Sequence, residues 1–185
     1  MTVRQKVISY AAELTGALDA MRGVAATPQR ILLAQQRALG TLRRRLPPEA
    51  KRDIGAEYNL APTRIAQGLS TRVTADGLVL IGSARGVNAM AFGATWSPRW
   101  SGGARFAIKR GGDRSPHPES FIAVGRSGNR LVFVRKGKPR LPIQGVYGPS
   151  LGQMLKHGRR PERLVEFALR VLASEQLRLL GSGAP

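Results

Sequence analysis

The stretch LSTRVTADGLVLIGS, residues 69–83, decides the fold class, because the hydrophobic pattern changes there from that of helices to that of β-strands. Two runs rich in β-branched and aliphatic residues flank Ala75-Asp76-Gly77. An Asp-Gly pair between two such runs is a strong signal for a hairpin turn. We therefore expect the first β-hairpin at residues 69–83.

The residues before this hairpin have the spacing of amphipathic helices. Apolar side chains recur every three or four positions from Val3 to about Arg22 and predict a first helix. Thr27 followed by Pro28 is typical of a helix start, and the apolar spacing then continues to Pro47-Pro48, where we expect a break. Another helical stretch is expected from Pro48, and a short one from Pro62.

The residues after the hairpin predict more strands and then more helices. We expect a short helical turn around 87–92, a half-buried strand over 104–110, and a second hairpin over 120–137 that turns at Ser127-Gly128-Asn129. The strands of this second hairpin are apolar on both faces and are expected to lie centrally. The chain becomes helical past Pro149, breaks at Gly158 and begins its last helix at Pro161.

This order of elements predicts an α+β fold, with N-terminal amphipathic helices, a small and mainly antiparallel sheet of two hairpins, and C-terminal helices. The sequence suggests an N-terminal helical arm at residues 1–46, an α+β domain at 47–180 and a flexible tail at 181–185.

The charge of the chain points to polyanionic partners. Its 185 residues include 30 Lys and Arg against 11 Asp and Glu, for a formal net charge of +19. It contains no cysteine, which rules out disulfides and thiolate chemistry. The N-terminal apolar pattern is interrupted by Arg4, Lys6, Glu13 and Asp19, so we expect neither a signal peptide nor a membrane span.

Residues for catalysis are scarce. The two histidines, His117 and His157, lack partners at catalytic spacing, and a solvent-exposed or helix-capping role is expected for both. The carboxylates are scattered without a metal-binding pattern, and the glycines do not match a phosphate-binding loop. We therefore expect a protein that is not an enzyme and has no cofactor, metal or small-molecule substrate.

Two basic clusters remain as candidate contacts with DNA or an acidic protein partner. One is Arg43-Arg44-Arg45, for which the alternative is that the cations complement the dipole at a helix C-terminus. The other lies between Arg99 and Arg140, and its candidate residues are Lys109, Arg110, Arg126, Arg130, Arg135 and Lys136. Ten aromatic residues and no recognisable DNA-reading motif indicate contact with the phosphate backbone, without sequence specificity.

The most specific motif is a pair of proline-containing elements near the C-terminal helices. Arg140-Leu141-Pro142-Ile143 is followed by Tyr147-Gly148-Pro149-Ser150, after the strand FVRKG at 133–137. Together with SFIA at 120–123 and the arginine after the second strand, this pair resembles the minor tail protein Z family of tailed bacteriophages. The resemblance extends over roughly residues 40 to 180 and is sharp over 120 to 155.

The resemblance implies a structural virion protein that completes the head-proximal end of a long phage tail. It implies a homo-oligomer, with six copies expected, around the path of the phage DNA. The implied neighbours are a tail terminator or tail-tube protein and a head connector or stopper protein. The implied role is head–tail joining and placement of the DNA end, with no enzyme activity and no membrane contact.

The residues of the motif also have a physical interpretation. Pro149 suits the first turn of a helix after the permissive Gly148, and Ser150 is the N-cap if the helix begins one residue later. The apolar residues of the segment have two alternatives: they anchor it to its own core, or they form an interface between subunits. They are Leu141, Ile143, Val146, Tyr147 and Leu151. The alternative function is that of a stand-alone basic protein that binds the phosphate backbone of nucleic acid.

Overall fold

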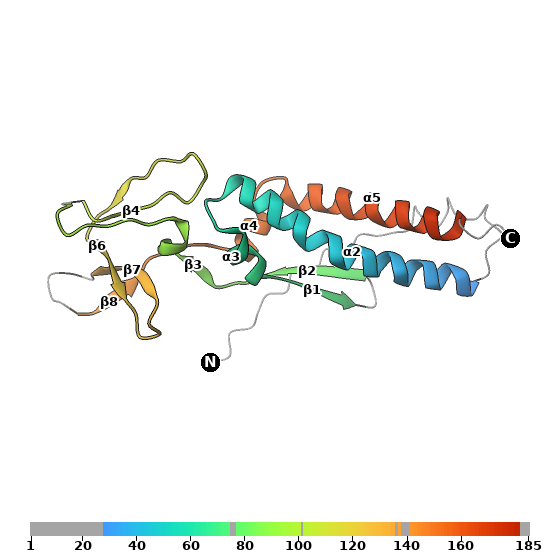
Figure 1. The fold of residues 1–185 in the computed structure, drawn as a ribbon, viewed down its shortest axis with the longest axis horizontal. Coiled ribbons are helices and arrows are strands. Elements are labelled where there is room, and N and C mark those ends of the chain that lie inside the picture. Colours follow the sequence, from blue (N-terminus) through green and yellow to red (C-terminus); the bar gives the residue numbers. More distant parts are fainter. Residues whose placement is uncertain (1–27, 75–76, 101, 136, 138–140, 182–185) are drawn as a thin grey trace. The chain divides into compact units, whose positions relative to one another are not determined.

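The computed structural model describes residues 28–74, 77–100, 102–135, 137 and 141–181 (Figure 1). Helices lie at both ends of this part of the chain, with small antiparallel sheets between them, so the predicted α+β fold is confirmed. The predicted helix at 3–22 lies outside the described residues, as do residues 182–185 of the predicted tail.

The chain forms two compact units, and each is assembled from separate segments of sequence. We call the first the helical unit; its described residues lie within 28–50, 69–81 and 155–181. We call the second the strand unit; it comprises 51–68 and 82–154. These units differ from the division at residues 46 and 180 that the sequence suggested, because the hairpin at 69–81 packs with helices that precede and follow it in the chain.

The helical unit is built on two long helices and the first hairpin. Its elements are α2 (Pro28–Glu57, of which residues up to Ala50 belong here), β1 (Leu69–Thr74), β2 (Gly77–Gly82) and α5 (Arg160–Gly181) (Figure 1). The pairing of β1 with β2 confirms the predicted first hairpin. The buried core residues are Ala38, Leu42, Leu46 and Ala50 from α2 with Leu164, Val171 and Leu172 from α5. Leu78 and Leu80 of β2 pack against this core, so all three elements share one hydrophobic centre.

The predicted break at Pro47-Pro48 is wrong, because α2 continues through both prolines to Glu57. A proline lacks the amide hydrogen that bonds the carbonyl four residues earlier, which here belongs to Arg43 and Arg44. Both arginines are exposed, so water can reach these carbonyl groups. Leu42, Leu46 and Ala50 are buried at four-residue intervals across the prolines, and this packing holds the helix together.

The strand unit contains the short elements. They are α3 (Pro62–Gln67), β3 (Gly86–Asn88), the 3₁₀ helix η1 (Ala89–Phe92), β4 (Ala104–Arg105), β5 (Pro116–His117), β6 (Ser120–Val124), β7 (Arg130–Arg135), β8 (Ile143–Gly145) and β9 (Tyr147–Ser150), followed by α4 (Leu151–Lys156). Strands β3 and β9 pair antiparallel, as do β4 and β5, while β6, β7 and β8 form a three-stranded antiparallel sheet in that order. The short helix at Pro62, the helical turn before Gly93 and the second hairpin are as predicted.

Two predictions about strands need correction. The strand expected over 104–110 ends at Arg105, where its partner is Pro116, which has no amide hydrogen to continue the ladder. The second hairpin is not central throughout: β7 is the middle strand, but β6 is an edge strand, and its Val124 side chain is exposed. A strand with apolar side chains on both faces can therefore be an edge strand as well as a central strand in this small sheet.

Buried polar side chains join the loops of the strand unit. The Asn88 side chain accepts hydrogen bonds from the backbone N–H of Val132 (3.0 Å) and of Met90 (3.0 Å), and donates to the Val132 carbonyl (3.3 Å). Ser120 accepts from the Ala104 N–H (2.9 Å) and donates to the His117 carbonyl (2.6 Å). These contacts fix β3 against β7 and the β4–β5 pair against the start of β6.

Candidate functional site

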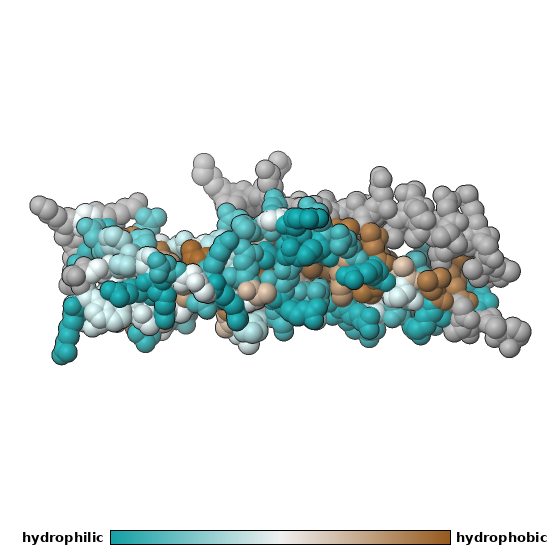
Figure 2. Space-filling view, turned by 90° about the horizontal axis from the view of Figure 1, so that it is seen from above, coloured by the Kyte–Doolittle hydropathy of each residue, from teal (hydrophilic) through white to brown (hydrophobic). Residues whose placement is uncertain are grey.

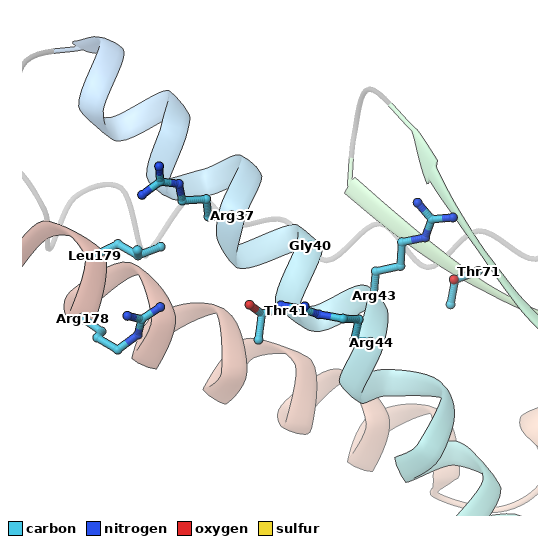
Figure 3. Close-up of a pocket in the computed structure, with 8 residues that line it drawn as sticks. All are labelled: Arg37, Gly40, Thr41, Arg43, Arg44, Thr71, Arg178 and Leu179. Carbon is cyan, nitrogen blue, oxygen red and sulfur yellow. The ribbon is translucent and has the colours of Figure 1, made fainter.

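The helical unit has an open pocket rich in arginine, which we call the basic groove (Figure 3). It has a volume of about 800 Å³. Its lining residues are Arg37, Gly40, Thr41, Arg43 and Arg44 from α2, Thr71 from β1, and Arg178 and Leu179 from α5. Four arginines from two helices therefore line one open pocket that has no acidic residue in its lining.

The side chains of the basic groove reach it from different directions. Arg43 extends on the side of Thr71, whereas Arg44 extends along α2 toward Thr41 (Figure 3). Arg178 is already held by Glu175, one turn earlier in α5, through an ion pair of 2.7 Å between Nη2 and Oε2. A Cβ atom added at Gly40 would meet nothing within 4 Å, so this position leaves the helix backbone open to a ligand.

The predicted triplet Arg43-Arg44-Arg45 is divided by the structure. Arg43 and Arg44 line the basic groove, whereas Arg45 is exposed but does not line it. The triplet lies inside α2 and not at its C-terminus, so the helix-dipole explanation is wrong. Pro47 and Pro48 suggested that the helix ends after Arg45, but α2 continues through them.

The basic candidates of the strand unit do not form one site. Lys109 makes an ion pair of 2.9 Å with Glu57, and the Arg110 backbone N–H donates to the Glu57 carbonyl. The guanidinium of Arg135 lies over the Phe121 ring, 5.2 Å from its centroid. Arg126 and Arg130 are exposed at the turn between β6 and β7. Lys136 and Arg140 lie outside the described residues.

The alternative that the apolar residues of the motif anchor it to its own core holds for only two of them. Val146 packs on the core of the strand unit and Leu151 is buried. Leu141, Ile143 and Tyr147 are 68%, 39% and 60% exposed, so an anchoring role in their own core is wrong for these three. The space-filling view of one face shows a mostly hydrophilic surface among the described atoms, with separate hydrophobic patches (Figure 2). Large exposed apolar side chains on such a surface are candidates for contact with another chain.

The other motif residues have structural roles. Pro142 is exposed just before β8, and Pro149 lies in β9 and not in the first turn of a helix, which corrects that expectation. A Cβ atom at Gly148 would lie 2.8 Å from the fully buried Phe92 ring, so only glycine fits there. Ser150 is the N-cap predicted for a helix that begins one residue later: its hydroxyl accepts from the Gln153 N–H (3.2 Å), and the Gln153 side chain accepts from the Ser150 N–H (2.8 Å).

The histidines and carboxylates do not gather into a metal site within the described residues. No group of three or more His, Asp or Glu side chains that could hold a metal ion occurs in that part of the chain. The His117 ring is half-buried and stacks on Phe106, with 6.1 Å between ring centroids. Among the described helices, none is long and apolar enough to cross a membrane.

No protein-family model, no curated protein and no solved structure matches this chain. The resemblance to the phage tail family therefore stays a prediction from the motif residues. The basic groove and the exposed motif residues are the observations from which function can be argued.

Sequence reasoning identified two of the four arginines of the basic groove, Arg43 and Arg44, and missed its other lining residues. Arg37 lies seven residues before Arg44, which places both on the same side of a helix, and this spacing could have been noticed. Thr71 and Arg178 lie far from α2 in sequence, and no local pattern connects them to it. Only the packing of β1 and α5 beside α2 brings these residues together.

Proposed function

We propose that this protein is a structural component of a phage virion that completes the head-proximal end of a long tail. In this role it assembles with copies of itself, as a hexamer, around the path of the DNA. Its neighbours are a tail terminator or tail-tube protein on one side and a head connector or stopper protein on the other. It acts by holding these parts together and not by catalysis.

The observation that carries the proposal is the exposure of Leu141, Ile143 and Tyr147 in a single chain. These residues belong to the motif on which the resemblance rests, and they lie in β8, in β9 and just before them. Ile143 and Tyr147 are held by the pairing of β8 with β7 and of β9 with β3, and Leu141 lies two residues before β8. Paired strands that present apolar side chains outward are suited to a permanent interface between subunits.

Oligomer formation by the full chain tests the interface. Mass photometry should show a ring-sized oligomer for the wild type, and Leu141→Asp or Tyr147→Asp should shift the population to monomers, because each places a charge in an apolar contact. Val124→Asp is the matched control, since Val124 is 67% exposed and lies in the same sheet as β8 but outside the motif. Equal assembly of all variants would count against an interface at the motif.

The position of the protein in the virion tests the role itself. Electron microscopy of particles that carry a tagged copy should place the label as a ring at the head-proximal end of the tail. A label that is absent from particles and found on free nucleic acid would contradict the tail role.

That second outcome would favour the alternative, a stand-alone protein that binds the phosphate backbone of nucleic acid. The specific observation in its favour is the basic groove with its four arginines. The alternative predicts a monomer or dimer with strongly salt-dependent affinity for DNA or RNA.

A further inference from the structure

The basic groove has the residue types of a phosphate site. Its four arginines offer planar forks of N–H donors, and the half-buried Thr41 and Thr71 add hydroxyl donors. Guanidinium and hydroxyl groups are the side-chain donors that most often contact the phosphates of nucleic acids. No carboxylate lines the groove, but Glu175 pairs with Arg178 from outside the lining. The arginines directed at an anion from outside are therefore Arg37, Arg43 and Arg44.

The spacing of the arginines suits a row of phosphates better than a single small anion. Arg37 and Arg44 are seven residues apart on α2, which corresponds to about 10 Å along the helix axis. Phosphates along one strand of DNA rise by about 3.4 Å each, so these two side chains can contact different phosphates of the same backbone. Gly40 lies between them, and the open space beside it lets a bulky backbone approach α2 closely.

The lining also indicates which part of a nucleic acid is recognised. It contains no aromatic ring on which a base could stack, and no Asn, Gln or acidic side chain that would read an adenine or cytosine edge. Leu179 and the alkyl stems of the arginines complete the walls. Such a surface contacts sugar and phosphate and does not distinguish sequences.

We propose that the basic groove binds the phosphate backbone of nucleic acid independently of base sequence. The groove is the surface through which the chain contacts DNA. The inference rests on the proposed function only for the identity of that DNA as the phage genome.

Binding of a fluorescently labelled 30-base-pair duplex to the full chain, followed by anisotropy over a range of NaCl concentrations, tests the groove. Affinity for DNA falls as salt rises, so the slope of log affinity against log salt is negative. The double variant R37Q/R44Q should make this slope shallower by about two units, because about one unit is lost with each phosphate contact. Arg45→Gln is the matched control: it removes one exposed charge next to Arg44, outside the groove, and should leave the slope within half a unit of wild type.

A second pair of variants tests occupancy of the groove without removing an arginine. Gly40→Glu places a carboxylate in the cavity and should weaken DNA binding at least tenfold at 50 mM NaCl. Gly40→Ala changes the same position without adding charge and should bind like the wild type. Neither side chain meets another atom of the chain at its Cβ, so both variants should fold.

Several outcomes would overturn the proposal. If R45Q makes the slope as much shallower per charge as R37Q/R44Q does, the affinity comes from the diffuse positive charge and not from the groove. If the groove variants bind duplex like the wild type but lose binding to poly-L-glutamate, the groove takes an acidic protein. The oligomeric state of the same variants separates this test from the tail role: loss of DNA binding with intact oligomers supports the groove even if particles never contain the protein.

Discussion

At the scale of single residues, Asn88 shows how one polar side chain organises the strand unit. It is 7% exposed, and it pairs with both backbone groups of Val132 much as a neighbouring strand would. The same side chain caps η1 through the Met90 N–H. A single residue thus joins β3 and the adjacent η1 to β7, where its partner Val132 lies 44 positions further along the chain.

We expect Asn88→Ala to lower the free energy of unfolding by about 1–3 kcal/mol, because it leaves the buried backbone N–H of Val132 without a partner, whereas the Val132 carbonyl still accepts from the Val146 N–H. Urea denaturation followed by circular dichroism would measure the change. Asn129→Ala is the control: the Asn129 side chain is exposed and its amide donates to Ser127, so its loss should cost no more than about 0.5 kcal/mol. A similar loss in both variants would mean that the Asn88 contacts are not specific.

At the scale of elements, the transition from β9 to α4 depends on a reciprocal cap. Ser150 ends the strand and begins the helix, and its exchange of hydrogen bonds with Gln153 satisfies two amide groups at the helix start. Leu151 follows at once and is buried, so the cap also directs an apolar side chain inward. The orientation of the exposed residues before it depends on this junction.

We expect Ser150→Ala to destabilise the protein by about 1 kcal/mol, within the range measured for other N-caps. Hydrogen exchange should show faster exchange of the Gln153 amide, whereas amides in α5 should be unaffected. Ser150→Asp keeps an acceptor at the cap and should restore most of the protection. Equal exchange in wild type and Ser150→Ala would show that the cap contributes nothing to α4.

At the scale of the whole molecule, the excess of positive charge is the dominant feature. A net charge of +19 on 185 residues makes like charges repel one another in the folded chain. Lys109–Glu57 and Arg178–Glu175 are ion pairs, but 11 acidic residues cannot neutralise 30 cations one to one. The free protein therefore carries a repulsion that an anionic partner would relieve.

We expect the Tm of the free protein to rise when NaCl is increased from 0.01 to 0.15 M, because the Debye length falls from about 30 Å to about 8 Å. Each kcal/mol of repulsion that is relieved should raise Tm by about 2–4 °C. Differential scanning fluorimetry would measure this, and KCl at the same ionic strength should give the same curve. A Tm that falls with salt would show that ion pairs outweigh the repulsion.

The sequence by itself determined the class of fold, the first hairpin and the positive charge, because each of these depends on neighbouring residues or on composition. It offered the cap at Ser150 as one of two helix starts, beside a start at Pro149. Asp76-Gly77 and Ser127-Gly128-Asn129 are local turn signals, and the Ser150 cap needs only a partner three residues later. Local patterns of this kind describe the backbone of one element at a time. They do not describe which elements meet.

Tertiary structure alone decided the continuity of α2, the composition of the basic groove and the exposure of the motif residues. The prolines at 47 and 48 are local signals for a break, but burial of Leu42, Leu46 and Ala50 against α5 and the first hairpin overrides them. Arg178 and Thr71 join Arg37 and Arg44 only because α5 and β1 pack beside α2. Leu141 is exposed while Leu151 is buried, although the two side chains are identical. Contacts between distant segments decide these three features, because the burial of a side chain depends on what packs against it and not on its neighbours in sequence.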